Sequence, residues 1–203
     1  MLIMRDAMQA LREAEPDAIV LAAETAIVAL GDISGPDDSY LPVSGMSKGS
    51  SVALGIALAQ PDRTVVVWDG DGCLLMNLGT LVTVSRAAPR NLVHVILANG
   101  VYALTGAQPL PSEGVSDLPE MARAAGYRQV CTFAGLEEFK TDLPGILAGD
   151  GPTLVALDTE TEVIPVAGWS RRPNPPKGWQ AMVPTIRNSL AAEATPGASG
   201  KAR

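Results

Sequence analysis

Apolar residues along this chain occur either in short continuous runs or at helical spacing. The runs at 18–22, 64–68 and 92–98 are rich in Val, Ile, Leu and Ala, a pattern typical of strands that are buried on both faces. Between the second and third runs, residues 73–88 carry apolar side chains at helical spacing. A strand, a glycine-rich turn, a helix and a strand in this order predict a βαβ unit with two parallel strands.

The rest of the chain continues this alternation. The same patterns predict helices over 1–15, 48–60, 117–126 and 136–147, the last interrupted at Pro144, and strands over 129–133 and 153–158. Residues 31–42 and the segment after Gln108 are rich in turn formers or lack apolar periodicity, so they are predicted to be loops. We therefore predict a three-layer α/β/α fold with a mainly parallel sheet.

The composition changes after residue 160. Four prolines, two tryptophans and three basic residues lie between 165 and 179. We expect residues 1–160 to form one domain and residues 161–193 to form an arm with a final helix, laid over this chain or another subunit. The low-complexity segment 194–203 is predicted to be a disordered tail.

Charge and cysteine content exclude several kinds of protein. The net charge is −7 without a basic run, which argues against binding to nucleic acid or to an anionic membrane surface. No apolar stretch reaches the roughly 20 residues that a membrane span needs, and the N-terminus lacks a signal-peptide core. Cys73 and Cys131 are too few for a disulfide framework, so we expect a cytoplasmic protein. His94, within an apolar run, is interpreted as structural.

Polar residues follow both strands of the central unit. Asp71 lies between Gly70 and Gly72 after the first strand, and Asn99 follows the second strand 28 residues later (99 − 71). Both turns lie at the carboxyl edge of the sheet, where ligands of open α/β sheets bind. A carboxylate, an amide oxygen and a nearby carbonyl suit Mg²⁺ or Ca²⁺. The glycines let a phosphate approach the start of the helix.

Both polar residues also have a structural interpretation without a ligand. Asp71 would then be a turn residue between a strand and a helix. Asn99 and Gly100 would form an ordinary Asn-Gly turn. The spacing that brings the two residues to one edge favours the ligand site.

The series GDGCLLMNLG, ANGVY and TGAQ resembles the thiamine diphosphate (ThDP) motif of ThDP-dependent enzymes. It is similar in particular to the ThDP-binding half of sulfopyruvate and phosphonopyruvate decarboxylases, over roughly residues 1–160. The resemblance implies the ThDP-binding fold of the PP module, which holds the metal and the diphosphate. Cys73 stands where this family usually has Ser, and Ala98 stands where Asn or Asp is usual.

The resemblance also implies roles for individual residues. Asp71, Asn99 and the Val101 carbonyl would bind Mg²⁺. Gly72 and Cys73 would meet the diphosphate, and Gly70 and Tyr102 belong to the same two motif segments of the cofactor site.

Two upstream segments resemble further parts of that site. Glu24 and Thr25 resemble an ETGTS-like segment near the cofactor, although they are equally consistent with a helix start. The turn of Ser44, Gly45, Met46 and Ser47 resembles a GSMG turn whose bulky residue wedges between the two rings of ThDP. Met46 would be that wedge, and the alternative is an ordinary core methionine.

The resemblance finally implies an incomplete site. ThDP enzymes need a second, pyrimidine-binding (PYR) module that supplies a glutamate to the cofactor, and 203 residues hold only the first module. We expect a heterotetramer of two such chains with two PYR subunits, which decarboxylates a small 2-oxo acid. No catalytic residue is assigned here, and Glu24 lies on the wrong module to be that glutamate. The alternatives are a carboligase subunit, a 2-oxoacid:ferredoxin oxidoreductase β subunit, which two cysteines disfavour, and a non-catalytic partner.

Overall fold

The computed structural model describes residues 1–35, 39–111 and 114–162, together with 183–184, 187–188 and 191. The predicted tail and most of the predicted arm and final helix lie outside the described residues. Within them, no helix is both long and apolar enough to cross a membrane.

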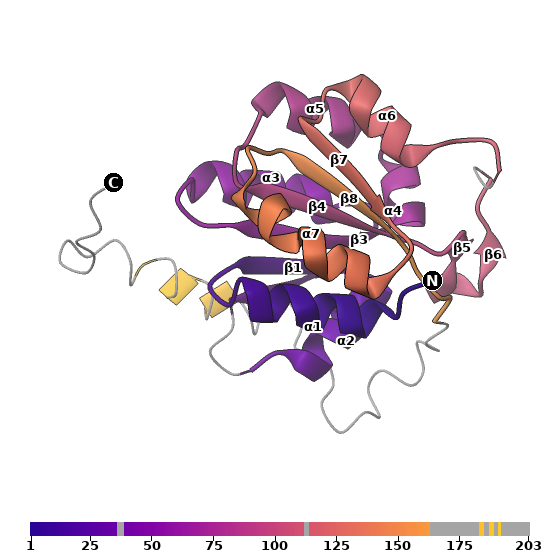
Figure 1. Ribbon diagram of the computed structural model, residues 1–203, viewed down its shortest axis with the longest axis horizontal. Helices are drawn as coiled ribbons and strands as arrows, with labels where there is room; N and C mark the ends of the chain where they lie inside the picture. Colours follow the sequence, from indigo (N-terminus) through magenta and orange to yellow (C-terminus); the bar gives the residue numbers. More distant parts are fainter. Residues whose placement is uncertain (36–38, 112–113, 163–182, 185–186, 189–190, 192–203) are drawn as a thin grey trace.

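A parallel sheet of six strands forms the centre of the fold (Figure 1). Its strands are β1 (Ile19–Ala23), β2 (Tyr40–Val43), β3 (Val65–Gly70), β4 (Leu92–Ala98), β7 (Gln129–Phe133) and β8 (Thr153–Asp158). Their spatial order is β2-β1-β3-β4-β8-β7. The central strands are buried along almost their whole length, as their continuous apolar runs predict.

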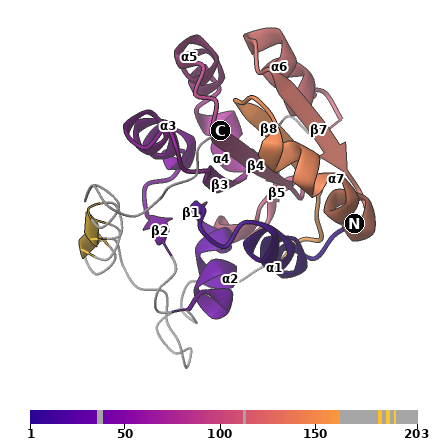
Figure 2. The same cartoon turned by 60° about the vertical axis from the view of Figure 1, so that its left-hand side comes forward.

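Helices cover both faces of this sheet (Figure 2). One face carries α1 (Met4–Ala14), α2 (Thr25–Ile33) and α7 (Leu136–Ala148). The other carries α3 (Gly49–Ala59), α5 (Gly79–Ala87) and α6 (Leu118–Ala125), and the short α4 (Asp71–Met76) follows β3 directly. The predicted three-layer α/β/α fold is therefore confirmed.

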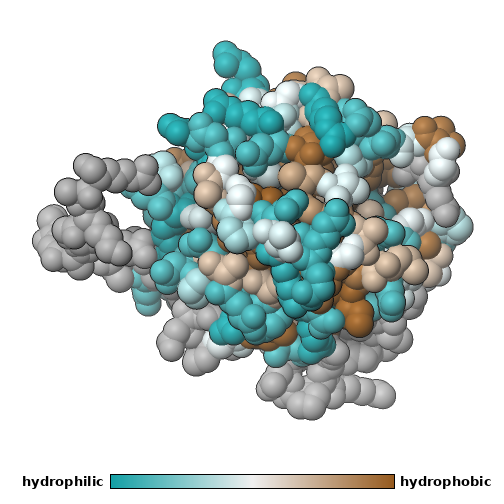
Figure 3. Space-filling view, in the orientation of Figure 1, coloured by the Kyte–Doolittle hydropathy of each residue, from teal (hydrophilic) through white to brown (hydrophobic). Residues whose placement is uncertain are grey.

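The amphipathic helices place their polar sides outward. Helix α1 buries Met4, Ala7, Met8 and Leu11, and the face of the molecule in Figure 3 is mostly hydrophilic with small apolar patches. The predicted interruption of α7 at Pro144 is wrong, because the helix continues through it. Pro144 lies on the exposed side, where water can reach the carbonyl that a proline leaves without an N–H partner.

The predicted loop over 31–42 is wrong in two places. Helix α2 extends to Ile33, and Tyr40–Val43 form strand β2, which pairs with β1 from Val20↔Tyr40 onward. All four residues of β2 are buried, which accounts for the strand despite its turn-rich surroundings. Pro42 is tolerated because β2 is an edge strand and needs no donor on its outer side.

The helix predicted over 73–88 is in fact two helices, α4 and α5. Between them, the Asn77 side chain donates a hydrogen bond to the Ser47 carbonyl at 3.1 Å. This tertiary contact, which local periodicity cannot reveal, ties the break to the turn after β2.

Short elements that the sequence did not predict follow Asn99, and the last of them includes the first residue after Gln108. Strands β5 (Val101–Tyr102) and β6 (Gln108–Pro109) form a short antiparallel pair around a 3₁₀ turn, Ala103–Thr105. Residues 114–117 continue as a loop to α6, and the Asp117 carboxylate caps this helix by accepting a hydrogen bond from Glu120 N–H at 2.9 Å.

Replacement by alanine is expected to change the stability of the chain in opposite directions at two of its glycines. A Cβ at Gly151 would lie 2.9–3.1 Å from three backbone carbonyl oxygens, so Gly151→Ala should lower the free energy of unfolding by about 2 kcal/mol or more. A Cβ at Gly55, inside α3, meets nothing within 4 Å. Gly55→Ala should therefore raise stability by about 0.5–1 kcal/mol. Urea unfolding of both variants checks the pair, and equal effects would contradict the packing around Gly151.

Candidate cofactor and active site

The site lies where the strand order of the sheet reverses. After β1 the chain passes to β2 on one side, and the later strands β3 and β4 follow on the other. Open α/β sheets bind ligands at the carboxyl ends of the strands beside such a point. Here a cavity opens, lined by Glu24, Thr25, Met46, Gly70, Asp71, Gly72, Cys73, Met76, Asn99, Val101, Tyr102, Ala103, Leu104 and Thr105.

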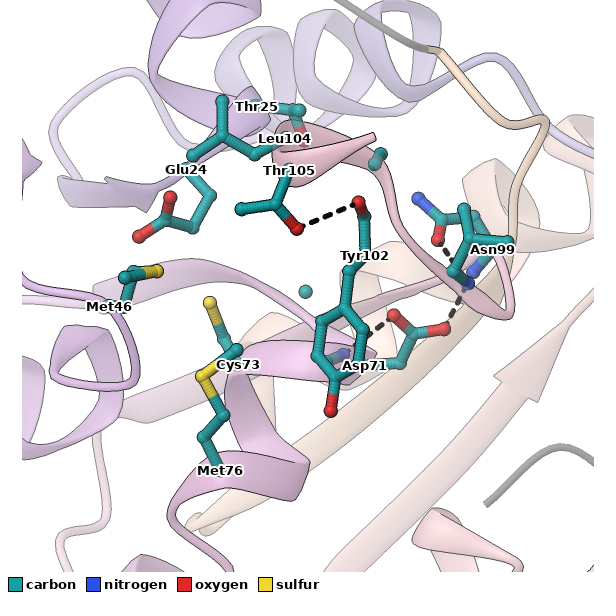
Figure 4. Close-up of a pocket in the computed structure, with 14 residues that line it drawn as sticks. Glu24, Thr25, Met46, Asp71, Cys73, Met76, Asn99, Tyr102, Leu104 and Thr105 are labelled. Carbon is teal, nitrogen blue, oxygen red and sulfur yellow. Dashed lines mark hydrogen bonds between the residues drawn. The ribbon is translucent and has the colours of Figure 1, made fainter. Parts of the chain in front are cut away.

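Asp71 is the first residue of α4, directly after β3, and its carboxylate joins the two turns of the central unit. Its Oδ1 accepts a hydrogen bond from Gly72 N–H at 2.7 Å, and its Oδ2 accepts bonds from Asn99 N–H at 2.9 Å and Gly100 N–H at 2.8 Å. Burial raises the pKa of Asp71, and these backbone N–H groups oppose the rise. The spacing of Asp71 and Asn99 in the sequence therefore does bring both residues to one place (Figure 4).

Asn99 presents its amide oxygen beside this carboxylate. Asn99 Oδ1 accepts a hydrogen bond from Val101 N–H at 3.1 Å, which fixes the orientation of the amide. An amide oxygen has a second lone pair for another partner. No cluster of three His, Cys, Asp or Glu side chains occurs in the described residues, so a metal at this edge would use Asp71, Asn99 Oδ1 and a backbone carbonyl. This all-oxygen set fits Mg²⁺.

Gly72 lies where no larger residue would fit without a shift of its neighbours. A Cβ at this position would lie 2.7 and 2.8 Å from ring atoms of Tyr102 and 3.3 Å from Leu110. The backbone at the start of α4 therefore packs directly against the Tyr102 ring, beside the Asp71 carboxylate.

Cys73 follows in the first turn of α4 and is 5% exposed. Burial, reinforced by the negative charge of Asp69, raises the pKa of its thiol to about 12. At neutral pH the side chain is therefore an uncharged thiol and a poor nucleophile.

We expect Cys73 to resist alkylation. At pH 8, iodoacetamide should modify the half-buried Cys131 at least ten times faster than Cys73, which has less access and less thiolate. Mass spectrometry of the labelled peptides measures both rates, and the chain in denaturant is the control in which both should react alike. Equal rates in the folded chain would contradict the buried position of Cys73.

Met46 lies in the turn between β2 and α3 and is 52% exposed. The interpretation as a core methionine is therefore wrong, and its side chain lines the cavity. Ser44, Gly45 and Ser47 are in the same turn but do not line the cavity. Ser44 and Gly45 are exposed, while Ser47 is buried and its carbonyl accepts the Asn77 bond.

Glu24 and Thr25 are both at a helix start and in the cavity wall, so their two interpretations are compatible. Glu24 precedes α2 with φ 55° and ψ −126°, a conformation that costs a non-glycine residue about 1–3 kcal/mol. Its buried Oε1 has no hydrogen-bond partner among the described residues. Burial, followed by the charge of Asp69, raises the pKa of Glu24 to about 7.

Sequence reasoning missed part of this site. Met76, Ala103, Leu104 and Thr105 also line the cavity, and the hairpin that places the last three has no periodic signal. Behind the cavity, His94 bonds to the Tyr127 hydroxyl at 3.1 Å, and its Nε2 lies 3.6 Å from Asp69 Oδ2. Asp69 comes directly before the GDG motif, and this position is the sequence signal that could have identified it as part of the site.

Fold and site together define a ThDP-binding α/β domain. Residues 35–157 match the family model described as thiamine pyrophosphate enzyme, C-terminal TPP binding domain. The chain belongs to this family of thiamine pyrophosphate enzymes.

Two curated relatives match more than half of this chain. Phosphonopyruvate decarboxylase of Streptomyces hygroscopicus is 50% identical over 121 residues, 60% of this chain and 30% of that protein. Sulfopyruvate decarboxylase subunit beta of Methanothermobacter thermautotrophicus is 44% identical over 113 residues, 56% of this chain and 57% of that subunit. The chain thus spans less than two thirds of either relative.

A solved structure supports the fold. The structure of a thiamin diphosphate-dependent enzyme from Mycobacterium smegmatis aligns with a TM-score of 0.67 and 26% identity, over 79% of this chain and 32% of that one.

Proposed function

We propose that this chain is the cofactor-binding subunit of a two-chain ThDP-dependent decarboxylase that acts on a small 2-oxo acid. The observation that carries the proposal is the Asp71 carboxylate, held by backbone N–H groups from both turns in a cavity at the switch point of the sheet. The similarity to a sulfopyruvate decarboxylase beta subunit supports the two-chain arrangement. Sulfopyruvate and phosphonopyruvate are the substrates that the relatives' names suggest.

Different residues of this chain would bind the metal and the diphosphate. Asp71, Asn99 Oδ1 and the Val101 carbonyl would hold Mg²⁺, whose charge would offset the cost of burying the Asp71 carboxylate. The backbone at Gly70, Gly72 and Cys73 would meet the diphosphate. ThDP, when bound, supplies the carbanion chemistry of decarboxylation.

The other cavity residues would shape the space around the cofactor. The exposed Met46 would support the bent shape of ThDP, and the Tyr102 ring would close the wall opposite Gly72. We assign no hydroxyl contact at position 73, since Cys73 offers a thiol.

A PYR-module subunit would complete the site and supply the glutamate for the cofactor. We propose a heterotetramer with two copies of each chain. The cytoplasm is the proposed compartment, because Cys73 and Cys131 are both free thiols and reducing conditions keep thiols in that state.

We expect the isolated chain to bind Mg²⁺ and ThDP weakly and to decarboxylate no 2-oxo acid, because the proposed PYR subunit would supply the other part of the site. Calorimetry and an assay for carbon dioxide would test the chain alone and after co-expression with its PYR partner. Light scattering of the active species should show both chains. Turnover by the chain alone would contradict the proposal.

A further inference from the structure

Glu24 combines three features that an ordinary helix start does not need. It is one of four non-glycine residues with positive φ in the described chain, and its ψ of −126° is far from the left-handed helical region that Asn or Asp can adopt. Its Oε1 is buried without a hydrogen-bond partner in the described structure. Its side chain lines the same cavity as Asp71 and Asn99.

The surroundings of Glu24 favour the neutral form of its carboxyl group. The ionisable side chains near it are Asp69 at the end of β3 and Cys73 on α4, and Asp71 and Tyr102 line the same cavity. Lys, Arg and His are absent from the described residues that line the cavity. An acid that is half protonated near pH 7 can give up a proton and regain it at physiological pH.

The position of Glu24 relative to the metal site is also informative. Figure 4 shows Asp71 and Asn99 at one end of the cavity, and Glu24 with Met46 at the other, with the Glu24 carboxyl group turned into the space above Cys73. A cofactor whose metal is held at Asp71 and Asn99 and which is supported by Met46 would fill the cavity between these residues and Glu24. A carboxyl group there is close to where a substrate would react.

Decarboxylation of a 2-oxo acid needs a proton at that place. The bond between the keto carbon and the carboxylate carbon breaks, carbon dioxide leaves, and the electron pair stays with the former keto carbon. That carbon must take up one proton before an aldehyde can be released.

We propose that Glu24 is a catalytic residue, whose neutral carboxyl group delivers this proton to the substrate carbon. The carboxylate that remains takes a proton from water, so the cycle balances without another reactant. This role rests on the proposed decarboxylase function. It differs from that of the PYR-module glutamate, which acts on the cofactor.

The decisive test follows the two products separately in the active complex of this chain with its PYR partner, ThDP and Mg²⁺. Under single-turnover conditions with sulfopyruvate or phosphonopyruvate, Glu24→Gln should release carbon dioxide within threefold of the wild-type rate. Its aldehyde release should be at least fiftyfold slower, because the amide keeps the shape but has no acidic proton. The matched control is Glu138→Gln, at an exposed position on α7, which should change neither rate.

The outcomes separate this role from its alternatives. An equal loss of both products in Glu24→Gln would indicate a structural role and refute the proposal, and so would unchanged release of both. A wild-type complex that releases no carbon dioxide with any 2-oxo acid would refute the decarboxylase function, and this role with it.

A second readout needs no partner. The strained backbone conformation of Glu24 should lower the stability of the fold, and glycine adopts a positive φ without that cost. Glu24→Gly should therefore unfold at a higher urea concentration than the wild-type chain at pH 8. The folded-state pKa is raised, so ionisation destabilises the fold as pH rises from about 4.5 to about 7. Glu24→Gln has no carboxyl group to ionise at this position. The difference in free energy of unfolding between Glu24→Gln and the wild-type chain should therefore grow in favour of the variant across this pH window and level off above it. An unfolding midpoint of Glu24→Gly at or below that of the wild type would contradict the strained placement.

Discussion

Replacing Asp71 with Ala is expected to abolish Mg²⁺-dependent binding of ThDP to this chain, with a loss of affinity of at least tenfold. The site offers one carboxylate, so its removal leaves the metal with neutral oxygens alone against the charge of the diphosphate. Calorimetry with Mg²⁺ and ThDP measures the loss. An unchanged affinity would disprove the assignment of Asp71.

The same substitution should also weaken the fold. Asp71→Ala leaves the N–H groups of Gly72, Asn99 and Gly100 without their acceptor, at about 1–3 kcal/mol for each one that water cannot reach. Asp71→Asn, which keeps one oxygen acceptor, should unfold less readily than Asp71→Ala yet still lose metal-dependent affinity. Asn99→Ala should reduce affinity in the same direction but less, because an amide oxygen is a weaker ligand than a carboxylate.

The central βαβ unit could be predicted from sequence because its strands are buried on both faces. Val65 to Trp68 and Leu92 to Leu97 are all buried, and His94 is the one polar residue within these two runs. Parallel pairing then fixes where each strand ends, and this brings Asp71 beside Asn99.

Elements that depend on tertiary contacts could not be predicted in the same way. Strand β2 is short and contains Pro42, and only its pairing with β1 makes it a strand. The break between α4 and α5 carries the contact of Asn77 with Ser47. The β5–β6 pair has two residues in each strand, too few for any period to show.

Some properties of individual site residues could be predicted from the sequence. The composition of the motif indicated oxygen ligands, and a resemblance indicated that Glu24 lies near the cofactor. The positive φ and the buried Oε1 of Glu24 depend on how α2 packs beside β1 and β3, so no sequence pattern reveals them. The same holds for the His94 pairing with Tyr127, which α6 and the following turn bring over the sheet.

The second large effect is expected at Gly72. Gly72→Ala would place a Cβ 2.7–2.8 Å from the Tyr102 ring, closer than carbon atoms can approach, so the ring or the start of α4 must move. Either movement disturbs the backbone proposed to meet the diphosphate. We expect the affinity for ThDP with Mg²⁺ to fall about tenfold or more, while the chain loses about 1–3 kcal/mol of stability.

Gly70→Ala is the matched control for this prediction. A Cβ at Gly70 meets nothing within 4 Å, and its φ of −88° is open to any residue, so the free chain should keep its stability. A loss of ThDP affinity in both variants, with a loss of stability only in Gly72→Ala, would indicate that the ligand itself approaches both glycines. A loss of affinity in Gly72→Ala alone would assign the effect to the Tyr102 contact. Full affinity in Gly72→Ala would refute the proposed diphosphate site at the start of α4.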